Sequence, residues 1–388
     1  MNIVHVCLNS SVTDGWNYQE NLLTKYQKRS GHEVAIITSR WMHNDTGGLV
    51  MDERTRYVND DGVVMIRLDM NGKEDSKRKL RTFRGLANEL DLLKPNIIFI
   101  HNVCSRDNVV LARYLKIHPD VIAYADSHAD FSNSATNWVS KNILHKIIWR
   151  HYAQMLVPYI KKFYGVLPAR VDFLKEIYGL PADKCQLLVL GADDDAVKEA
   201  ARPEIVQKIR KHHNIQKDDF LIVTGGKIDI WKTQTLLLME AVRNIDNPKV
   251  KLIVFGSVVP ELREKVDNLT DGKKIQYIGW IQAIDSYQYF AASDLVVFPG
   301  RHSVFWEQVV AQGVPMICKD WPGTRHIDLG GNVRFLKEDS EKEIRGEINL
   351  ILSMPNAYKH MKKVAADAGM KMFSYKDIAA QSIEMVGE

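Results

Sequence analysis

The sequence has few cysteines, and they form no recognisable pair. Cys7, Cys104, Cys185 and Cys318 are the only four among 388 residues, and no two of them make a Cys-x-x-Cys motif. This spacing argues against a disulfide framework and against a zinc site, and it is typical of a reducing cytoplasm. The first residues, MNIVHVC, have a strand pattern and lack the basic and apolar regions of a signal peptide.

Long hydrophobic runs and a strong charge of one sign are absent as well. No run reaches the roughly 18 apolar residues of a transmembrane helix, so we expect a cytoplasmic protein. The net charge is +4, with 45% hydrophobic and 26% charged residues, as in ordinary globular proteins. A nucleic-acid-binding protein would have a stronger basic bias, so we expect no nucleic-acid partner.

Short runs rich in valine and isoleucine alternate with helical patterns along the whole chain. A length of 388 residues is too great for one ordinary core. Because the runs are apolar on both faces, they predict two doubly wound α/β domains with parallel sheets. We place the boundary between Gly191 and Asp219, with domains over 1–190 and 191–372 and a helical tail over 373–388. The expected strands are 2–7, 33–38, 63–68, 97–101, 121–125, 163–167, 187–190, 220–224, 250–255, 275–278, 294–298, 314–317 and 333–336.

Two lysines follow the first strand of the second domain. The stretch FLIVTGGKIDIWKTQ ends its apolar run in two glycines, the second of them Gly226, and continues with Lys227 and Lys232 before a helix near Thr233. Open parallel sheets bind ligands outside the carboxyl ends of their strands, and a helix N-terminus attracts anions. The pattern favours a diphosphate site, although a solvated turn with two surface lysines fits the spacing equally well.

A histidine between two carboxylates follows another strand. Asp126, His128 and Asp130 stand in the stretch VIAYADSHADFSNSA. Such a histidine can orient a hydroxyl, accept a proton or bind a metal, but no second histidine pair stands at helical ligand spacing. The competing interpretation is a helix N-cap at Asp126 or Ser127.

Two further loops follow strands. The first strand leads into NSSVTDGWNYQENLL, where Gly15 allows a close backbone approach without forming a G-x-G-x-x-G fingerprint. The strand 294–298 leads into FPGRHSVFWEQVVAQGVP, where Glu307 stands in a first helical turn beside His302 and Trp306. A carboxylate can accept both hydroxyls of a vicinal diol. The simpler alternatives are an ordinary connection for the first loop and a favourable helix dipole for Glu307.

Two stretches, 73–86 and 140–162, are basic and amphipathic. The second combines isoleucine, leucine, tryptophan and tyrosine with Lys141, Lys146, Lys161 and other basic residues. A helix of this kind can lie on an anionic membrane, or it can be an ordinary surface helix with an apolar core face.

The order of these motifs resembles that of the family 4 glycosyltransferases of the GT-B fold, over nearly the whole chain. Members carry Gly-Arg or Gly-Lys and then a lysine five residues later, here Lys227 and Lys232, and a histidine after an N-domain strand, here His128 in SHAD. IQYIGWI, with Gly279, resembles a strand that ends in glycine. ASDLVVFPG and EQVVAQGVP, with Glu307, follow in the family's order, and FSYKDIA resembles its last helix.

The resemblance implies two Rossmann-like domains that face a central cleft, with the helix 373–388 crossing back to the N-terminal domain. It implies an acceptor side on the N-terminal domain and a UDP- or GDP-linked sugar bound by the C-terminal domain. No cofactor and no metal are implied. Lys227 and Lys232 would neutralise the diphosphate, and Glu307 would accept the ribose hydroxyls.

The remaining implied roles concern residues around these groups. His128 would contact the 6-hydroxyl of the donor sugar, with Asp126 and Asp130 on the acceptor side. The other donor-binding residues implied in this way are Gly15, Gly226, Gly279 and Ile281.

One departure from the family pattern concerns the donor sugar. Members have two glutamates separated by seven residues, whereas the position eight before Glu307 is Pro299. The task of the missing glutamate would fall to Arg301, His302 or Ser303, or to backbone N–H groups up to Val304.

We therefore expect a retaining, metal-independent glycosyltransferase that acts in the synthesis of bacterial surface polysaccharide or another glycoconjugate. Its acceptor would be a glycan or a lipid-linked molecule, with peripheral contact to an anionic membrane as an additional expectation. A non-catalytic nucleotide-sugar-binding partner of another transferase and a sugar-nucleotide epimerase of the same fold are the alternatives.

Overall fold

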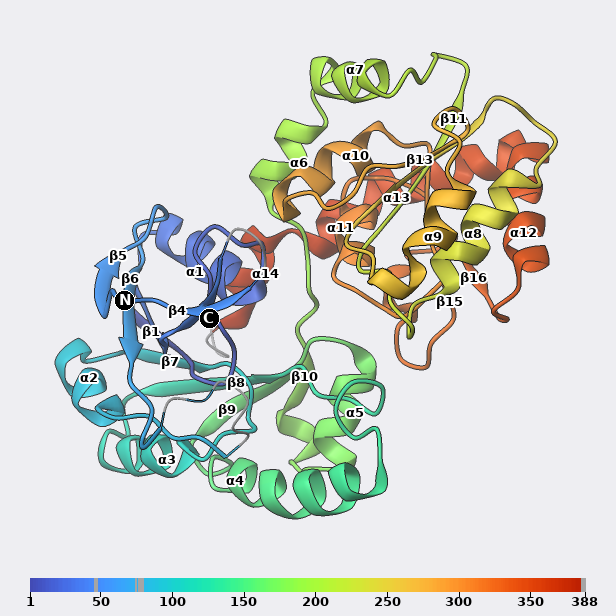
Figure 1. Ribbon diagram of the computed structural model, residues 1–388. Helices are drawn as coiled ribbons and strands as arrows, with labels where there is room; N and C mark the ends of the chain where they lie inside the picture. Colours follow the sequence, from blue (N-terminus) through green and yellow to red (C-terminus); the bar gives the residue numbers. More distant parts are fainter. Residues whose placement is uncertain (45–47, 74, 76–79, 385–388) are drawn as a thin grey trace. The chain divides into compact units, whose positions relative to one another are not determined.

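The chain folds into two compact units, each with its own sheet. The computed structural model describes residues 1–44, 48–73, 75 and 80–384 (Figure 1). Unit 1 comprises Met1–Val189 and Tyr375–Glu388, and unit 2 comprises Leu190–Ser374. Both units combine helices with mainly parallel strands, which confirms the α/β class expected from the alternating pattern.

The sheet of unit 1 has eight strands in the order β10-β9-β8-β7-β1-β2-β6-β5. Neighbouring strands are parallel, except that β5 runs antiparallel to β6. The strands are β1 (Asn2–Cys7), β2 (Glu33–Ser39), β5 (Arg56–Val58), β6 (Val64–Leu68), β7 (Ile97–Ile100), β8 (Ile122–Ser127), β9 (Ile160–Gly165) and β10 (Cys185–Leu187), with a separate pair β3 (Trp41–His43) and β4 (Leu49–Met51). The helices are α1 (Gln19–Arg29), α2 (Leu86–Leu93), α3 (Asn108–Ile117), the π-helix η1 (Ser140–Trp149), α4 (Arg150–Gln154), α5 (Pro168–Glu176), the 3₁₀ turn η2 (Ala182–Lys184) and α14 (Tyr375–Ser382).

The sheet of unit 2 has six parallel strands in the order β13-β12-β11-β14-β15-β16. The strands are β11 (Phe220–Gly225), β12 (Val250–Phe255), β13 (Ile275–Tyr277), β14 (Leu295–Phe298), β15 (Met316–Lys319) and β16 (Val333–Leu336). The helices are α6 (Asp194–Ala200), α7 (Pro203–His212), α8 (Gln234–Arg243), α9 (Pro260–Leu269), α10 (Ser286–Ala292), α11 (Phe305–Ala311), α12 (Glu341–Ser353) and α13 (Pro355–Phe373), with 3₁₀ turns η3 (Ala283–Asp285) and η4 (Arg325–Ile327).

Both sheets have central strands that are apolar on both faces. All four residues of β7 are buried, as are all four of β14, because helices cover both sides of each sheet. In each sheet the strand order reverses at one point, between β1 and β7 in unit 1 and between β11 and β14 in unit 2. Loops at the carboxyl ends of the strands on either side of such a point are the usual ligand site of an open α/β sheet.

The predicted strands are present with small shifts at their ends, but β3, β4 and β5 were not predicted. These three strands have three residues each, and none of their residues is buried. They therefore lack the buried apolar run on which the prediction depends.

The predicted helix over 140–162 is too long. Helix η1 and helix α4 end at Gln154, and Lys161 and Lys162 lie on strand β9. The other basic stretch, 73–86, lies partly outside the described residues, since 74 and 76–79 are not described. Across the described part of the chain, no helix combines the length and apolarity needed to cross a membrane.

Candidate functional site

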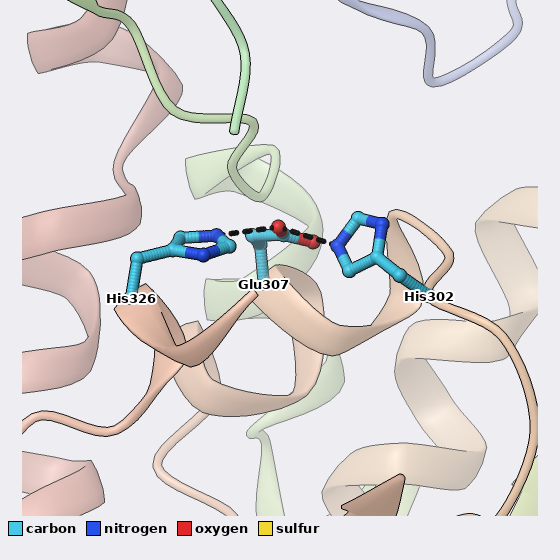
Figure 2. A group of neighbouring side chains, drawn as sticks. All are labelled: His302, Glu307 and His326. Atoms are coloured by element: carbon cyan, nitrogen blue, oxygen red, sulfur yellow. Dashed lines mark hydrogen bonds and ion pairs between the residues drawn. The ribbon is translucent and has the colours of Figure 1, made fainter. Parts of the chain in front are cut away.

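Glu307 forms the centre of a cluster with two histidines. It lies in the first turn of α11, where a negative charge is favoured by the helix dipole. Its Oε1 accepts hydrogen bonds from Nε2 of His302, at 2.8 Å, and from Nε2 of His326, at 2.9 Å (Figure 2). His302 comes from the loop after β14 and His326 from the turn η4 that follows β15, so neighbouring strands of the sheet bring the three residues together.

The cluster has a defined arrangement of charge. Glu307 is 0% exposed, and burial alone would raise the pKa of its carboxyl group. The charges and hydrogen bonds of His302 and His326 outweigh burial and lower that pKa to about 2. Because an ionised carboxylate only accepts hydrogen bonds, each histidine carries a proton on Nε2.

Three polar atoms of the cluster take no part in its two hydrogen bonds. Oε2 of Glu307 and Nδ1 of His326 are buried and have no hydrogen-bond partner among the described residues. The side chain of His302 is 10% exposed, and its Nδ1 points away from the carboxylate (Figure 2).

The same three side chains are of the kinds that bind metal ions. One ligand atom from each lies within 4.8 Å of the other two. However, both histidine Nε2 atoms approach a single oxygen at distances typical of N–H···O bonds. Hydrogen bonding therefore accounts for the cluster without a metal ion.

The cluster bears on the predicted role of Glu307. Oε1 of this buried carboxylate is shared by two histidines, while Oε2 has no partner among the described residues, so the contact with ribose hydroxyls stays a prediction. His302 has the ring nitrogen that is turned away from this carboxylate, while Arg301 is exposed and Ser303 and Val304 are half-buried. The sequence prediction missed His326, because nothing in its local pattern connects it with a residue 19 positions away.

The lysine loop lies on the other side of the reversal point in unit 2. Gly226 has φ +122°, and a Cβ on Gly256 in the neighbouring loop would lie 2.0 Å from the carbonyl oxygen of Gly226. Lys227 is largely exposed, and its Nζ lies 3.8 Å from the carboxylate of Asp229. Lys232 is half-buried and donates its backbone N–H to the carbonyl of Asp229. The loop thus places Lys227 and Lys232 in the segment that leads into α8.

Two exposed tryptophans occupy loops at the same edge of this sheet. Trp231, in the lysine loop, is 68% exposed, and Trp280, in the loop after β13, is 55% exposed. Gly279 accepts the backbone N–H of Gly256 at 2.7 Å, which joins the loops after β12 and β13, and Ile281 is half-buried. The sequence analysis named Gly279 and Ile281 as donor-binding residues but not Trp231, although a tryptophan in a loop that follows a strand was a visible signal.

The histidine motif of unit 1 has a different structure from the N-cap alternative. Asp126 and Ser127 end strand β8, and the next helix begins at Ser140, so the N-cap interpretation is wrong. Asp126 is completely buried, and its oxygens accept hydrogen bonds from His101 Nδ1 and from the backbone N–H of Asn102. Burial would raise the pKa of Asp126, but His101 and His128 lower it well below its usual value.

Neither aspartate of this motif is placed to contact an acceptor. The carboxylate of Asp126 is inaccessible, as described above. Asp130 is also buried: Oδ1 accepts from Ser132 and from the backbone of Asn133, and Oδ2 accepts from Arg170 Nε. Asp130 therefore organises its own loop. The exposed member of the motif is His128, whose Nε2 lies 3.8 Å from Asp126 Oδ2.

The first loop of unit 1 is open around Gly15. Its φ is +74°, and a Cβ there would meet nothing within 4 Å. The neighbouring Asp14 accepts a hydrogen bond from the hydroxyl of Tyr57 at 2.7 Å. This contact anchors the loop and leaves the backbone of Gly15 accessible.

The fold and these loops define the class to which the chain is similar. It has the GT-B fold of glycosyltransferases, and residues 205–368 match the model of the family described as "Glycosyl transferases group 1". This segment contains the lysine loop, the Glu307 cluster and both exposed tryptophans.

Three particular proteins illustrate the similarity. Mannosylfructose-phosphate synthase from Agrobacterium fabrum is 21% identical in a match of 264 residues. The match covers 63% of this chain, and the chain spans 55% of that relative's length. The structure of Anabaena HepE in complex with UDP superposes with a TM-score of 0.68 at 16% identity and covers 98% of both chains. WaaG, a glycosyltransferase involved in lipopolysaccharide biosynthesis, superposes with a TM-score of 0.69 at 12% identity and covers 99% of this chain and 100% of its own.

Proposed function

We propose that the protein is a retaining, family 4-type glycosyltransferase that moves a hexose from a nucleoside diphosphate sugar to an acceptor hydroxyl. The observation that carries this proposal is the lysine loop at the strand-order reversal of the unit 2 sheet, inside the segment that matches a glycosyltransferase family. Lys227 and Lys232 supply two positive charges there, and α8 begins directly afterwards with unpaired N–H groups in its first turn.

The chemistry follows from the charge of the leaving group. A departing nucleoside diphosphate gains negative charge in the transition state, and two lysines with a helix N-terminus stabilise that charge. A phosphate oxygen of the leaving group can accept the proton of the attacking hydroxyl, so the reaction needs no protein base. We accordingly propose that turnover requires no metal ion.

The other loops supply donor contacts in this proposal. Trp231 and Trp280 offer aromatic faces for the nucleobase, which is uracil or guanine. His302 replaces the missing glutamate as a ligand for donor hydroxyls, held by its hydrogen bond to Glu307. In unit 1, His128 contacts the donor sugar, and the backbone near Gly15 approaches the diphosphate.

We further propose a lipid-linked or glycan acceptor from bacterial surface polysaccharide synthesis, reached at the inner face of the membrane. An exposed apolar row on and before helix η1 supports membrane contact: Trp138, Val139, Ile143 and Ile147. The exposed side chain of Lys146 adds positive charge beside this row. Positive charge next to an apolar surface attracts anionic lipid headgroups. The structural similarity to WaaG, a glycosyltransferase involved in lipopolysaccharide biosynthesis, also supports an acceptor of this kind.

A turnover assay with one charge-removing variant tests the central claim. The purified protein should release UDP or GDP from a nucleotide sugar in the presence of a metal chelator, and Lys232→Ala should abolish this release. Lys273→Ala, which removes an exposed lysine before β13, serves as the matched control. Undiminished turnover by Lys232→Ala would exclude the assigned role.

The same assay separates the alternatives. Nucleotide binding, seen as a thermal shift, without turnover of any donor would indicate a non-catalytic partner of another transferase. Conversion of the donor sugar without an acceptor would indicate an epimerase.

A further inference from the structure

A chain of buried side chains crosses unit 1 from its last helix to the motif that contains His128. It links Ser382 on α14, Gln27 on α1, His5 on β1, His101 after β7 and Asp126 on β8. All five side chains are buried. The successive distances are 3.1 Å from Gln27 Nε2 to Ser382 Oγ, 2.7 Å from His5 Nε2 to Gln27 Oε1, 2.9 Å from His5 Nδ1 to His101 Nε2, and 2.9 Å from His101 Nδ1 to Asp126 Oδ2.

The direction of the first bonds is set by a backbone carbonyl. Ser382 Oγ lies 2.7 Å from the carbonyl oxygen of Ala379, which can only accept, so the hydroxyl proton of Ser382 is donated there. Ser382 must then accept from the amide NH₂ of Gln27. This fixes the Gln27 amide with its oxygen toward His5, so Nε2 of His5 donates.

The direction of the remaining bonds determines the protonation of both histidines. Burial, together with the neighbouring His101, lowers the pKa of His5 to about 3, so its ring is neutral, with a proton on Nε2 and a lone pair on Nδ1. That lone pair requires a proton on Nε2 of His101. Asp126 requires a second proton, on Nδ1 of His101, because its carboxylate can only accept.

We propose that His101 is a buried imidazolium whose charge balances Asp126, and that this ion pair is the positioning element for His128. Asp126 Oδ2 accepts from His101 and also lies 3.8 Å from Nε2 of His128. Because His101 already balances its charge, Asp126 does not present an isolated negative charge to His128. The pair can therefore orient the ring of His128 toward a neutral sugar hydroxyl.

The ring of His101 contacts three side chains. His5 stacks against it, Phe99 packs at a tilted angle, and Asp126 faces its Nδ1. The titratable side chains that bond to His101 are His5 on β1 and Asp126 on β8. His128 in turn lies 3.8 Å from Asp126. The role given to His128 rests on the proposed function, whereas the proton arrangement of His101 does not.

The proton arrangement can be tested without any substrate. In the full chain labelled with ¹⁵N-histidine, His101 should show two protonated ring nitrogens at about pH 8, where an ordinary histidine is neutral. Loss of its signals in His101→Gln assigns the resonances. Asp126→Asn removes the counter-charge and should leave His101 with one ring proton. A lone-pair nitrogen on His101 at that pH in the unaltered protein would overturn the proposal.

The positioning role needs a second readout. Asp126→Asn should lower kcat by on the order of tenfold or more, with a smaller change in KM for the donor, and should shift the ring resonances of His128. Asp107→Asn is the matched control, since Asp107 is equally buried in unit 1 and lies outside this chain of bonds. An unchanged kcat in Asp126→Asn would refute the positioning role. Absence of turnover in the unaltered protein with two protons on His101 would instead count against the proposed function.

Discussion

Glu307 joins two loops of unit 2, because His302 and His326 both donate hydrogen bonds to its Oε1. It lies in the first turn of α11, as the sequence predicts. Its burial and its two histidine partners were not predictable, because His326 reaches it through the pairing of β14 with β15. A contact that depends on the order of strands in a sheet leaves no mark at a fixed sequence spacing.

Neutralising Glu307 should destabilise unit 2 and weaken the function. In Glu307→Gln the amide oxygen can still accept hydrogen bonds from both histidines, but the negative charge of the carboxylate is lost. We expect the free energy of unfolding to fall by about 1–3 kcal/mol and donor turnover to decrease. Urea unfolding and the release assay measure these effects, with the exposed Glu264→Gln as control. Equal stability of Glu307→Gln and the unaltered protein would contradict the buried cluster.

The exposed apolar row on and before helix η1 leads to a prediction about membrane binding. The four-residue spacing of Val139, Ile143 and Ile147 keeps them along one side of this helix, beside Trp138. Trp138→Glu combined with Ile147→Glu should reduce co-sedimentation with vesicles that contain anionic lipid, because both charge and apolar contact change.

The control for this experiment is Ile117→Glu, on α3. Ile117 is as exposed as Ile147 but does not belong to the apolar row. If the double variant bound vesicles as well as Ile117→Glu does, the row would not be a membrane surface.

The contact between α11 and α13 gives a prediction on packing. A Cβ on Gly369 of α13 would lie 2.0 Å from the carbonyl oxygen of Val310 on α11, the helix that carries Glu307. Gly369→Ala should therefore destabilise the protein by about 1–3 kcal/mol. Gly346→Ala in α12, where a Cβ meets nothing within 4 Å, should instead stabilise it by about 0.5–1 kcal/mol. Thermal unfolding of both variants would show opposite shifts, and shifts of the same sign would refute the argument.

The elements that could be predicted are those with strong apolar periodicity. Strands such as β12 and β16 were predicted with their observed bounds, since each is a short apolar run between turn residues. The end of α4 at Gln154 was not predicted, because the apolar residues that continue to Ile160 fit a helix and a strand equally well.

At the scale of the whole molecule, buried ionisable groups predict how stability depends on pH. His5 takes up a proton at about pH 3 in the folded state, against an ordinary value of 6.5, so the unfolded chain binds more protons between these values. Stability should therefore fall as the pH is lowered from 6.5, by up to about 1.4 kcal/mol per pH unit from this residue. Glu307, with a pKa lowered from 4.5 to about 2, contributes stability above 4.5 that is lost as the pH falls further.

The contribution of His5 can be isolated above about pH 5.5, roughly one unit over the ordinary pKa of a glutamate, where Glu307 is largely ionised in both states. Urea unfolding between pH 6.5 and about 5.5 should show a shallower pH dependence for His5→Asn than for the unaltered protein. His212→Gln, at an exposed histidine of unit 2, should leave the dependence unchanged. Identical slopes for His5→Asn and the unaltered protein would show that His5 is not buried in its neutral form.

The fold as a whole was easier to predict than the site. The order of motifs along the chain predicted the GT-B fold even though no single motif was decisive. The buried links His5, His101 and Gln27 were not predicted, because their strand and helix patterns are those of ordinary core positions. Only the sheet order, with β1 beside β7, brings His5 and His101 together.

The position of Ser382 has a consequence for biosynthesis. Residues 1–189 of unit 1 precede unit 2 in the sequence, yet α14, which follows unit 2, supplies buried residues such as Tyr375, Ile378 and Ser382 to unit 1. On a ribosome, unit 2 has all of its residues while unit 1 still lacks this helix. We therefore expect the second half of the nascent chain to complete its folding first. Until residue 382 emerges, the histidine chain at the centre of unit 1 lacks the hydroxyl that orients it.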